Sequence, residues 1–176
     1  MNEMEEAILG GGCFWCLDAG LQNLRGVEKV EPAYAGGGLL NPTYKQVCSG
    51  STGHAEVVVI NFDKSLITFE DLLHAFFSIH DPTQLNRQGN DIGTQYRSVI
   101  MPVNSDQELV AKNVIEEVSS LFDKPVVTTI EEALNLTIAE EYHHDYYNKN
   151  PHAGYCSFVI APKLAKFRQK MSDMLE

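Results

Sequence analysis

The sequence is poor in positive charge and has no long apolar run. Its 176 residues include 13 Lys and Arg against 24 Asp and Glu, so the formal net charge is −11. Because a field of that sign repels phosphate groups, nucleic acid is not an expected partner. No stretch approaches the roughly 18 apolar residues that a membrane-spanning helix requires, so membrane association is not expected either.

Signals for export and for division into domains are also missing. Residues 1–7 contain three Glu and lack the cationic and apolar parts of a signal peptide, so we expect a cytoplasmic protein. No internal repeat, low-complexity tract or long Ser/Gly linker interrupts the sequence. We therefore expect residues 1–176 to form one domain, and we expect that domain to be a monomer.

Cysteine is scarce as well. The four thiols are too few and too unevenly spaced for the disulfide framework of a small secreted protein. They are Cys13, Cys16, Cys48 and Cys156. In a reducing compartment such residues serve as packing, as metal ligands or as redox groups, and the surrounding sequence must distinguish these uses.

Hydrophobic periodicity predicts strands that alternate with helices. The expected strands cover residues 7–9, 27–35, 57–62, 96–101 and 126–130, with further β-rich sequence up to residue 138. The expected helices begin after Gly12, at capping boxes formed by Thr68 with Asp71 and by Ser105 with Glu108, and at Pro162. This pattern indicates an α+β sandwich with a mixed sheet, in which residues 80–95 form a long polar loop suited to function.

The densest chemical signal is the segment GGGCFWC at residues 10–16. A cysteine where a strand turns into a helix faces unpaired backbone N–H groups and the positive end of the helix dipole, which lowers the pKa of its thiol. The glycines allow a tight turn that leaves the Cys13 sulfur accessible, and Phe14 with Trp15 supplies an aromatic wall. An isolated cysteine is more often a small buried core residue. Three glycines and the only tryptophan beside Cys13 favour a reactive thiol.

Cys13 and Cys16 also form a CxxC pair, which is compatible with a redox dithiol or with half of a zinc site. The other ligands available for zinc are His143, His144, His152 and Cys156. Their spacing matches no standard second half of a zinc site, so no metal is expected. The remaining histidines, His54, His74 and His80, are expected to have packing roles.

Two carboxylates stand apart from the many expected on an acidic surface. Glu56 precedes an apolar strand, where partial burial would raise its pKa and let it act as an acid near neutral pH. Asp91 lies in the polar loop, where it either serves the site or forms a local turn. Tyr44 and Tyr96 flank these segments and can donate phenolic hydrogen bonds, although tyrosines in such positions often serve in packing.

The C-terminal cysteine follows a run of turn-forming residues. The segment NPHAGYC at residues 150–156 is predicted to be a mobile loop that brings Cys156 to an oxidised Cys13. Cys48 has no such loop, so Cys156 ranks above it as a redox residue. Both cysteines remain open to a simpler interpretation as unpaired core or surface thiols.

Five motifs together resemble the A-type peptide methionine sulfoxide reductases. They are GCFWC at residues 12–16, YAGG at 34–37, NPTY at 41–44, TGHAEVV at 52–58 and GNDIGTQYRS at 89–98. The resemblance runs in register from Gly11 to Cys156, which is most of the chain. Ala33 stands where a glycine is common in the family, and Ile92 occupies a variable position. Five motifs in one order are far more specific than any one of them.

The resemblance implies a reductase of the S epimer of methionine sulfoxide, free or protein-bound. It makes Cys13 the nucleophile, which attacks the sulfoxide sulfur and becomes a sulfenic acid. The chemistry fits these residue types, because a sulfoxide sulfur becomes electrophilic only as its oxygen gains protons. The other residues that the resemblance assigns are Glu56, Tyr44 and Tyr96 as binders and proton donors of the departing oxygen, Asp91 as their support, and Phe14 and Trp15 as the apolar cage.

The resemblance also implies how the sulfenic acid is removed. Cys156, in a Tyr-Cys pair, matches the resolving position and would form a disulfide with Cys13 that thioredoxin reduces. Cys16, one helical turn from Cys13, is an alternative resolving residue. The implied fold is a two-layer α/β sandwich of the ferredoxin-like plait type, with the resolving-cysteine loop and a C-terminal helix at residues 148–176. Thioredoxin or another dithiol is the implied reductant, with no metal or organic cofactor.

Two other functions stay open on the sequence. A thiol-disulfide oxidoreductase that uses Cys13 and Cys16 alone would need neither Cys156 nor Glu56. A zinc-stabilised binding domain with an acidic surface would contain stoichiometric zinc and would unfold when a chelator removes it. Turnover of a sulfoxide and elemental analysis separate these two functions from the reductase.

Overall fold

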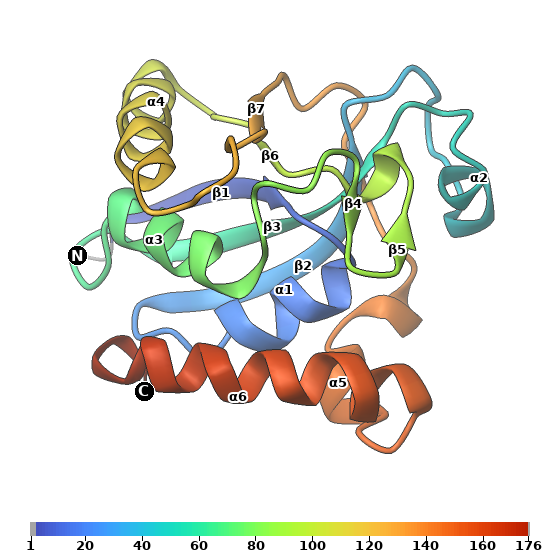
Figure 1. Cartoon of the computed structure of the whole chain (residues 1–176). Helices are drawn as coiled ribbons and strands as arrows, with labels where there is room; N and C mark the ends of the chain where they lie inside the picture. The colour runs from blue at the N-terminus through green and yellow to red at the C-terminus, as the bar shows by residue number, and fades with distance from the viewer. Residues whose placement is uncertain (1–2, 176) are drawn as a thin grey trace.

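A six-stranded mixed sheet forms the centre of the computed structural model, which describes residues 3–175 (Figure 1). The spatial order of its strands is β7-β6-β1-β3-β2-β8. They are β1 (Met4–Gly10), β2 (Val27–Ala35), β3 (Ala55–Asp63), β6 (Val99–Ile100), β7 (Thr129–Ile130) and β8 (Thr137–Ile138). Neighbours pair antiparallel except β6 and β7, which are parallel. The prediction of an α+β protein with a mixed sheet is therefore confirmed.

Three helices pack together beside this sheet. They are α1 (Phe14–Leu21), α3 (Phe69–Ile79) and α6 (Ala161–Lys170), and α1 also contacts β2 and β3 (Figure 1). The other helices are α2 (Tyr44–Cys48), α4 (Ser105–Ser119), which packs on α3, and α5 (Tyr146–Lys149). A small hairpin of β4 (Arg87–Gln88) and β5 (Asp91–Ile92) lies inside the predicted polar loop. Among residues 3–175, no helix is both long and apolar enough to cross a membrane.

Alternation along β3 lets one strand serve both the core and the site. Val58 and Ile60 are fully buried in the apolar cluster that includes α1, α3 and α6. Val57 and Val59 point to the other face of the sheet, where a second and smaller cluster is buried. By the same two-residue period, Glu56 points to the face that carries α1. The strand therefore delivers a carboxyl group to the end of a helix.

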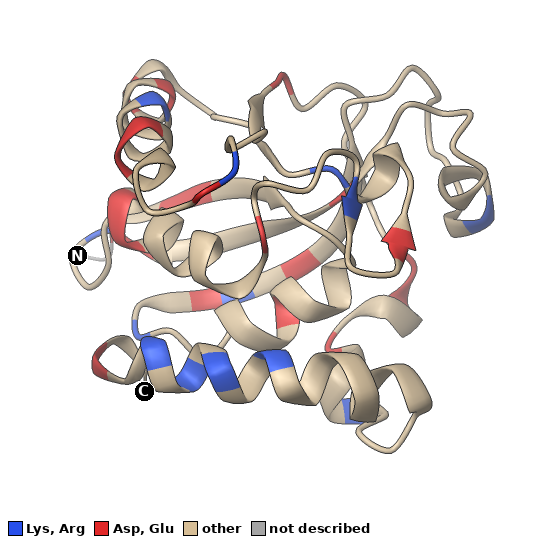
Figure 2. Cartoon of the chain, viewed as in Figure 1, with Lys and Arg blue, Asp and Glu red and all other residues tan. Residues whose placement is uncertain are grey.

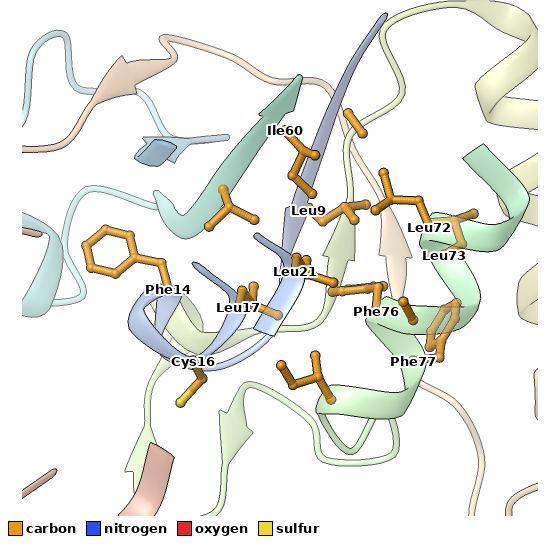
Figure 3. Packing of buried hydrophobic residues seen from close by; sticks show 14 of the residues in the cluster. Leu9, Phe14, Cys16, Leu17, Leu21, Ile60, Leu72, Leu73, Phe76 and Phe77 are labelled. Atoms are coloured by element: carbon orange, nitrogen blue, oxygen red, sulfur yellow. The ribbon is translucent and has the colours of Figure 1, made fainter. Parts of the chain in front are cut away.

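Helix α3 begins where the sequence predicts and supplies much of the core. Thr68 accepts a hydrogen bond from the backbone N–H of Asp71 at 3.0 Å, and the Asp71 carboxylate accepts one from the N–H of Thr68 at 3.5 Å. Its apolar face carries Leu72, Leu73 and Phe76 into one cluster with β1 and α1 (Figure 3). Burial of each such side chain contributes about 1.5–3 kcal/mol. This cluster holds the base of α1 in place.

Helix α4 has a different cap from the predicted one. It begins at Ser105, but its N-cap is Asn104, whose side chain accepts from the backbone N–H of Gln107 at 2.8 Å. The capping box of Ser105 with Glu108 is therefore not formed. Asn caps a helix as well as Ser does, and periodicity alone does not distinguish two adjacent candidates.

Two strands on one side of the sheet are shorter than predicted. The strand expected over residues 96–101 is reduced to Val99–Ile100 and follows a 3-10 turn, Thr94–Tyr96. The strand expected over residues 126–130 is reduced to Thr129–Ile130. An apolar, β-branched run becomes a strand only where it finds a partner to pair with, and that partner is not visible in the local sequence.

The C-terminal cysteine lies in a helix, so the predicted mobile loop is wrong for this residue. Cys156–Ile160 is a π-helix that continues directly into α6. Cys156 is fully buried in the apolar cluster shared with α1 and α6. Turn-forming residues do precede it, but burial of Cys156 and Ile160 against the helix layer overrides their local preference.

Charge is distributed unevenly over the molecule. Helix α6 contains Lys163, Lys166, Arg168 and Lys170 and no Asp or Glu, and Figure 2 shows this concentration of basic residues along the helix. Within residues 3–175, none of these four side chains forms an ion pair. The net charge of −11 therefore describes the whole molecule and not α6.

Candidate active site

Cys13 lies at the junction of β1 and α1. Gly12 adopts φ 81°, a left-handed conformation that suits glycine, and turns the strand into the helix. A Cβ on Gly10 would lie 2.9 Å from the backbone oxygen of Glu56, so this glycine allows the close approach of β3. Cys13 is the N-cap of α1, as expected, and only 4% of its surface is exposed.

Glu56 lies against the same helix start. The carboxyl group is fully buried, and its Oε1 accepts from the backbone N–H of Phe14 at 3.2 Å. Its Oε2 has no hydrogen-bond partner in the described part of the chain. Burial raises the pKa of Glu56 to about 8, although the Phe14 N–H and the Cys13 thiol act in the other direction. The predicted raised pKa is confirmed, and the carboxyl group holds a proton at neutral pH.

The pKa of the Cys13 thiol is raised, which reverses the sequence prediction. Burial is the largest cause, and the negative charges of Glu56 and Cys16 act in the same direction. The backbone N–H of Trp15, at the start of α1, lowers the pKa by less than burial raises it. A helix N-terminus favours a thiolate, but the loss of water around a buried sulfur disfavours it more. The resting thiol is therefore protonated.

Two tyrosines lie within the electrostatic reach of Glu56. Burial raises the pKa of both Tyr44 and Tyr96, and the charge of Glu56 is the second cause for each. Tyr44 begins α2, whose N-cap is Thr43. Tyr96 ends the 3-10 turn, and its backbone oxygen accepts from the N–H of Gly12 at 3.1 Å. Both phenols are neutral hydrogen-bond donors at physiological pH.

Asp91 reaches the site through a tyrosine. The hydroxyl of Tyr155 donates to Asp91 Oδ2 at 2.5 Å and lies 3.8 Å from Cys16 Sγ. The negative charge of Asp91 also contributes to the raised pKa of Cys13 and of Glu56. The structure therefore brings Asp91 together with the other candidate site residues.

An aromatic cluster lies next to Cys13 in the chain. The indole Nε1 of Trp15 donates to His143 Nδ1 at 3.0 Å, and the Trp15 ring stacks on Tyr146 with ring centroids 3.9 Å apart and planes 8° apart. The His143 ring lies 5.0 Å from the Phe14 ring and 4.4 Å from the Tyr44 ring. The predicted wall of Phe14 and Trp15 is thus part of a larger aromatic group.

Glu140 ties this group to the sheet. Its Oε1 accepts from the hydroxyl of Tyr34 at 2.8 Å, and its Oε2 accepts from the backbone N–H of Tyr44 at 3.1 Å. Tyr34 pairs with Glu56 in the register of β2 and β3. Although burial opposes the effect, hydrogen bonds that include these two lower the pKa of Glu140, which is ionised at neutral pH.

Five residues of the site were not predicted from the sequence as site residues. They are Tyr34, Glu140, His143, Tyr146 and Tyr155. Weak signals were present, since Tyr34 begins the YAGG motif, Tyr155 precedes the C-terminal cysteine, and His143 was considered only as a zinc ligand.

The zinc candidates do not converge on one point. His143 Nδ1 accepts from Trp15, and the Nε2 of His144 lies 2.9 Å from the backbone oxygen of Ala139. Burial lowers the pKa of His143 to about 4, so this ring is neutral. Within residues 3–175, the one group of possible metal ligands is Glu70, His74 and Glu117, which lies outside this site and contains no cysteine.

Three of the four thiols share one cluster. Cys13, Cys16 and Cys156 are buried in the same apolar core, whereas Cys48, at the end of α2, is exposed. The π-helix with Cys156 packs against α1, which begins beside Cys13. The ranking of Cys156 above Cys48 agrees with this arrangement.

A buried thiol beside a protonated carboxyl group, with further thiols in the same cluster, is the arrangement of a thiol-dependent reductase. The family model described as peptide methionine sulfoxide reductase matches residues 5–175. A relative from Nitratiruptor sp. named peptide methionine sulfoxide reductase MsrA is 55% identical over 172 residues, which are 98% of this chain and 99% of the relative. The chain belongs to the peptide methionine sulfoxide reductase family.

Solved structures agree with this assignment. Methionine sulfoxide reductase A of Corynebacterium diphtheriae is 32% identical with a TM-score of 0.80, covering 85% of this chain and 76% of that chain. Mxr1 of Saccharomyces cerevisiae in reduced form is 34% identical with a TM-score of 0.79, and the match covers 87% of this chain and 89% of that chain.

The same yeast protein has been solved in two other states. In an unusual oxidised form its TM-score is 0.63 at 31% identity, covering 85% of this chain and 83% of that chain. In complex with Trx2 the TM-score is 0.58 at 24% identity, covering 81% and 84%. This chain therefore matches the reduced form of Mxr1 more closely than the oxidised form.

Proposed function

We propose that this enzyme reduces the S epimer of methionine sulfoxide with Cys13 as the nucleophile and Glu56 as the acid. The observation that carries the proposal is the buried Oε2 of Glu56, which has no partner among the described residues although the group holds a proton. A buried polar atom is rarely left unpaired, so a free oxygen beside a reactive thiol suits a substrate atom that accepts a hydrogen bond.

The first chemical step begins with both the Cys13 thiol and the Glu56 carboxyl group protonated. As Glu56 gives its proton to the sulfoxide oxygen, with hydrogen bonds from Tyr44 and Tyr96, the sulfur becomes electrophilic and Cys13 attacks it. The thiol proton passes to the carboxylate as a bond forms between the Cys13 sulfur and the sulfoxide sulfur, and Glu56 gives it to the oxygen, which leaves as water when the S–O bond breaks. That water attacks the Cys13 sulfur, the S–S bond breaks to release methionine, and Glu56 takes back a proton. The net products are methionine and a Cys13 sulfenic acid, and no unpaired charge has to persist in the buried site.

The aromatic group supports selection of the substrate. Phe14, Trp15 and Tyr146 present apolar surface for the methyl group, while Glu56 and the phenols recognise the oxygen. Because the two sets of groups are fixed relative to the Cys13 sulfur, only one arrangement of methyl, oxygen and side chain about the sulfoxide sulfur suits the site. This arrangement is assigned to the S epimer. Asp91 supports the site by its charge and by orienting Tyr155.

The second step removes the sulfenic acid. Cys156 condenses with it to give a Cys13–Cys156 disulfide and one water molecule, and two electrons from an external dithiol then restore both thiols. Packing of the π-helix on α1 supports Cys156, and burial of Cys16 one turn from Cys13 supports it as the alternative. Because Mxr1 forms a complex with Trx2, we assign the reductant role to thioredoxin. No metal or organic cofactor has a part in this cycle.

We also infer the finer fold and setting of the enzyme. The chain order β1-α1-β2-β3-α3-β6, with spatial order β6-β1-β3-β2, supports a two-layer sandwich of the ferredoxin-like plait type.

We propose that residues 1–176 act as one domain and as a monomer, with the resolving segment in residues 148–176. Regeneration by thioredoxin requires a reducing compartment, so we propose the cytoplasm.

One turnover without reductant tests the proposal. The fully reduced protein is mixed with a peptide that contains the S epimer, and mass spectrometry maps the resulting disulfide and counts the methionine formed. We expect one equivalent of methionine and a Cys13–Cys156 bond, while the R epimer leaves the protein reduced. A Cys13–Cys16 bond would move resolution to Cys16. Absence of methionine would overturn the reductase chemistry.

A further inference from the structure

Besides Glu56 on β3, the protein has a buried carboxyl group on helix α1 that the proposed reaction does not use. Asp18 is 2% exposed and lies one turn beyond Trp15 on the same helix. Its Oδ2 accepts from the backbone N–H of Asp145 at 2.8 Å, and its Oδ1 accepts from Gln22 Nε2 at 3.2 Å. The hydrogen bond from Asp145 joins residues that are 127 positions apart in the sequence.

The partner of Asp18 is the residue that starts α5. Asp145 adopts a left-handed conformation with φ 54°, which is uncommon for a residue with a side chain. Its own Oδ1 accepts from Gln22 at 3.0 Å and from Asn148 at 2.7 Å. The next residue in the chain is Tyr146, whose ring stacks on Trp15. The strained turn is therefore held to α1 directly beside the aromatic wall.

We propose that Asp18 is a positioning residue that holds the turn at Asp145 on α1 and thereby sets the stack of Tyr146 on Trp15 against which the substrate packs. This inference rests on the proposed function only in giving the stack a substrate. Asp18 touches no reacting atom, and it acts by fixing where α5 begins.

Ionisation of Asp18 makes the docking of the Asp145 turn on α1 sensitive to pH. Burial raises the pKa of Asp18 to about 7; the Asp145 N–H lowers it and the Asp145 charge raises it. The titratable and charged groups that face Asp18 are Asp145, His144 and Lys149 and, across a cavity of about 270 Å³, Glu28 and Lys29. The docked turn binds the proton more tightly than an exposed carboxylate would. The contribution of the proton to docking is therefore fully present below the ordinary Asp pKa of 3.8 and is lost as the pH rises through 7.

The only tryptophan of the chain reports on this stack. We expect the fluorescence of Trp15 to titrate with a midpoint near pH 7 in the reduced protein. Asp18→Asn keeps an oxygen that can accept from Asp145 and cannot ionise, so it should abolish that midpoint and hold the low-pH signal. Asp18→Ala removes the acceptor, so it should show the high-pH signal at every pH and raise KM for a methionine sulfoxide peptide roughly tenfold.

Two matched variants separate Asp18 from its neighbours. Glu56→Gln removes the acid of the reaction, and His144→Gln removes a titratable group that faces Asp18; both should retain the midpoint near pH 7. A midpoint that survives in Asp18→Asn, or one that disappears only in His144→Gln, would overturn the proposal. Because fluorescence needs no turnover, these outcomes are independent of whether Cys13 reduces a sulfoxide. Far-UV circular dichroism checks that each variant is folded.

Discussion

The two walls of the active site are built in different ways. The sheet wall, formed by Cys13, Phe14 and Glu56, is fixed by backbone pairing along β1 and β3 and by the start of α1. The C-terminal wall is formed by Glu140, His143, Tyr146 and Tyr155. The first three lie at short helical turns and Tyr155 precedes the π-helix, and the wall is held by side-chain hydrogen bonds and ring stacking.

Because of this difference, the two walls suit different steps of the proposed cycle. Displacing the sheet wall would break the central strands, whereas the C-terminal wall can open locally at a smaller free-energy cost. In the proposed cycle, Cys13 and Glu56 must keep their geometry while Cys156, which follows Tyr155 in the chain, must reach an oxidised Cys13. The rigid wall therefore carries the first step, and the loosely held wall allows the second.

The largest effect should come from the nucleophile in the sheet wall. Cys13→Ser replaces the sulfur with a hydroxyl that cannot form a sulfenic acid, so methionine formation should fall to background in a single-turnover assay. Cys48→Ser, which changes an exposed thiol, is the control and should keep the wild-type rate. Measurable turnover by Cys13→Ser would remove it as the nucleophile.

Loss of the acid should have the next largest effect. Glu56→Gln should slow the single-turnover rate by roughly 10²–10⁴-fold, the usual contribution of general acid catalysis. Because the reaction needs the protonated form and the pKa of Glu56 is about 8, the wild-type rate should fall as the pH rises above 8. The variant should lack this limb of the pH profile, and an identical limb in both proteins would assign it to another group.

Cys156→Ser tests the second step without touching the first. The variant should form one methionine per enzyme at the wild-type rate and then stop when thioredoxin is the reductant, because no disulfide is available for exchange. Cys16→Ser should continue to turn over. If Cys16→Ser stops and Cys156→Ser continues, resolution lies in α1 and the C-terminal wall need not open.

The smallest effect should come from the link between the two walls. Tyr34→Phe removes the hydroxyl that donates to Glu140, which leaves a charged oxygen short of a partner and should lower the free energy of unfolding by about 2 kcal/mol in urea. Tyr147→Phe is the matched control, because the Tyr147 hydroxyl has no hydrogen-bond partner among residues 3–175. Equal losses in both variants would show that Glu140 does not join the walls.

Sequence reasoning succeeded where local rules determine geometry. The glycine turn before Cys13 and the apolar strand that follows Glu56 are both visible in a few consecutive residues. It failed for the C-terminal wall, because contacts such as Trp15 with His143 span 128 residues and join elements too short to show periodicity. It also gave the wrong direction for the pKa of Cys13, since desolvation depends on what covers the sulfur and not on its neighbours in the chain.

The π-helix before α6 has a geometric consequence for Cys156. An α-helix turns by about 100° per residue, and a π-helix accommodates one residue more than an α-helix in each hydrogen-bonded turn. If the extra residue moved into the preceding turn, Cys156 would rotate about the helix axis by about 100°. Leu164 and Phe167 would stay buried in the core. The direction in which the Cys156 thiol faces is thus set by the position of a single extra residue in the helix.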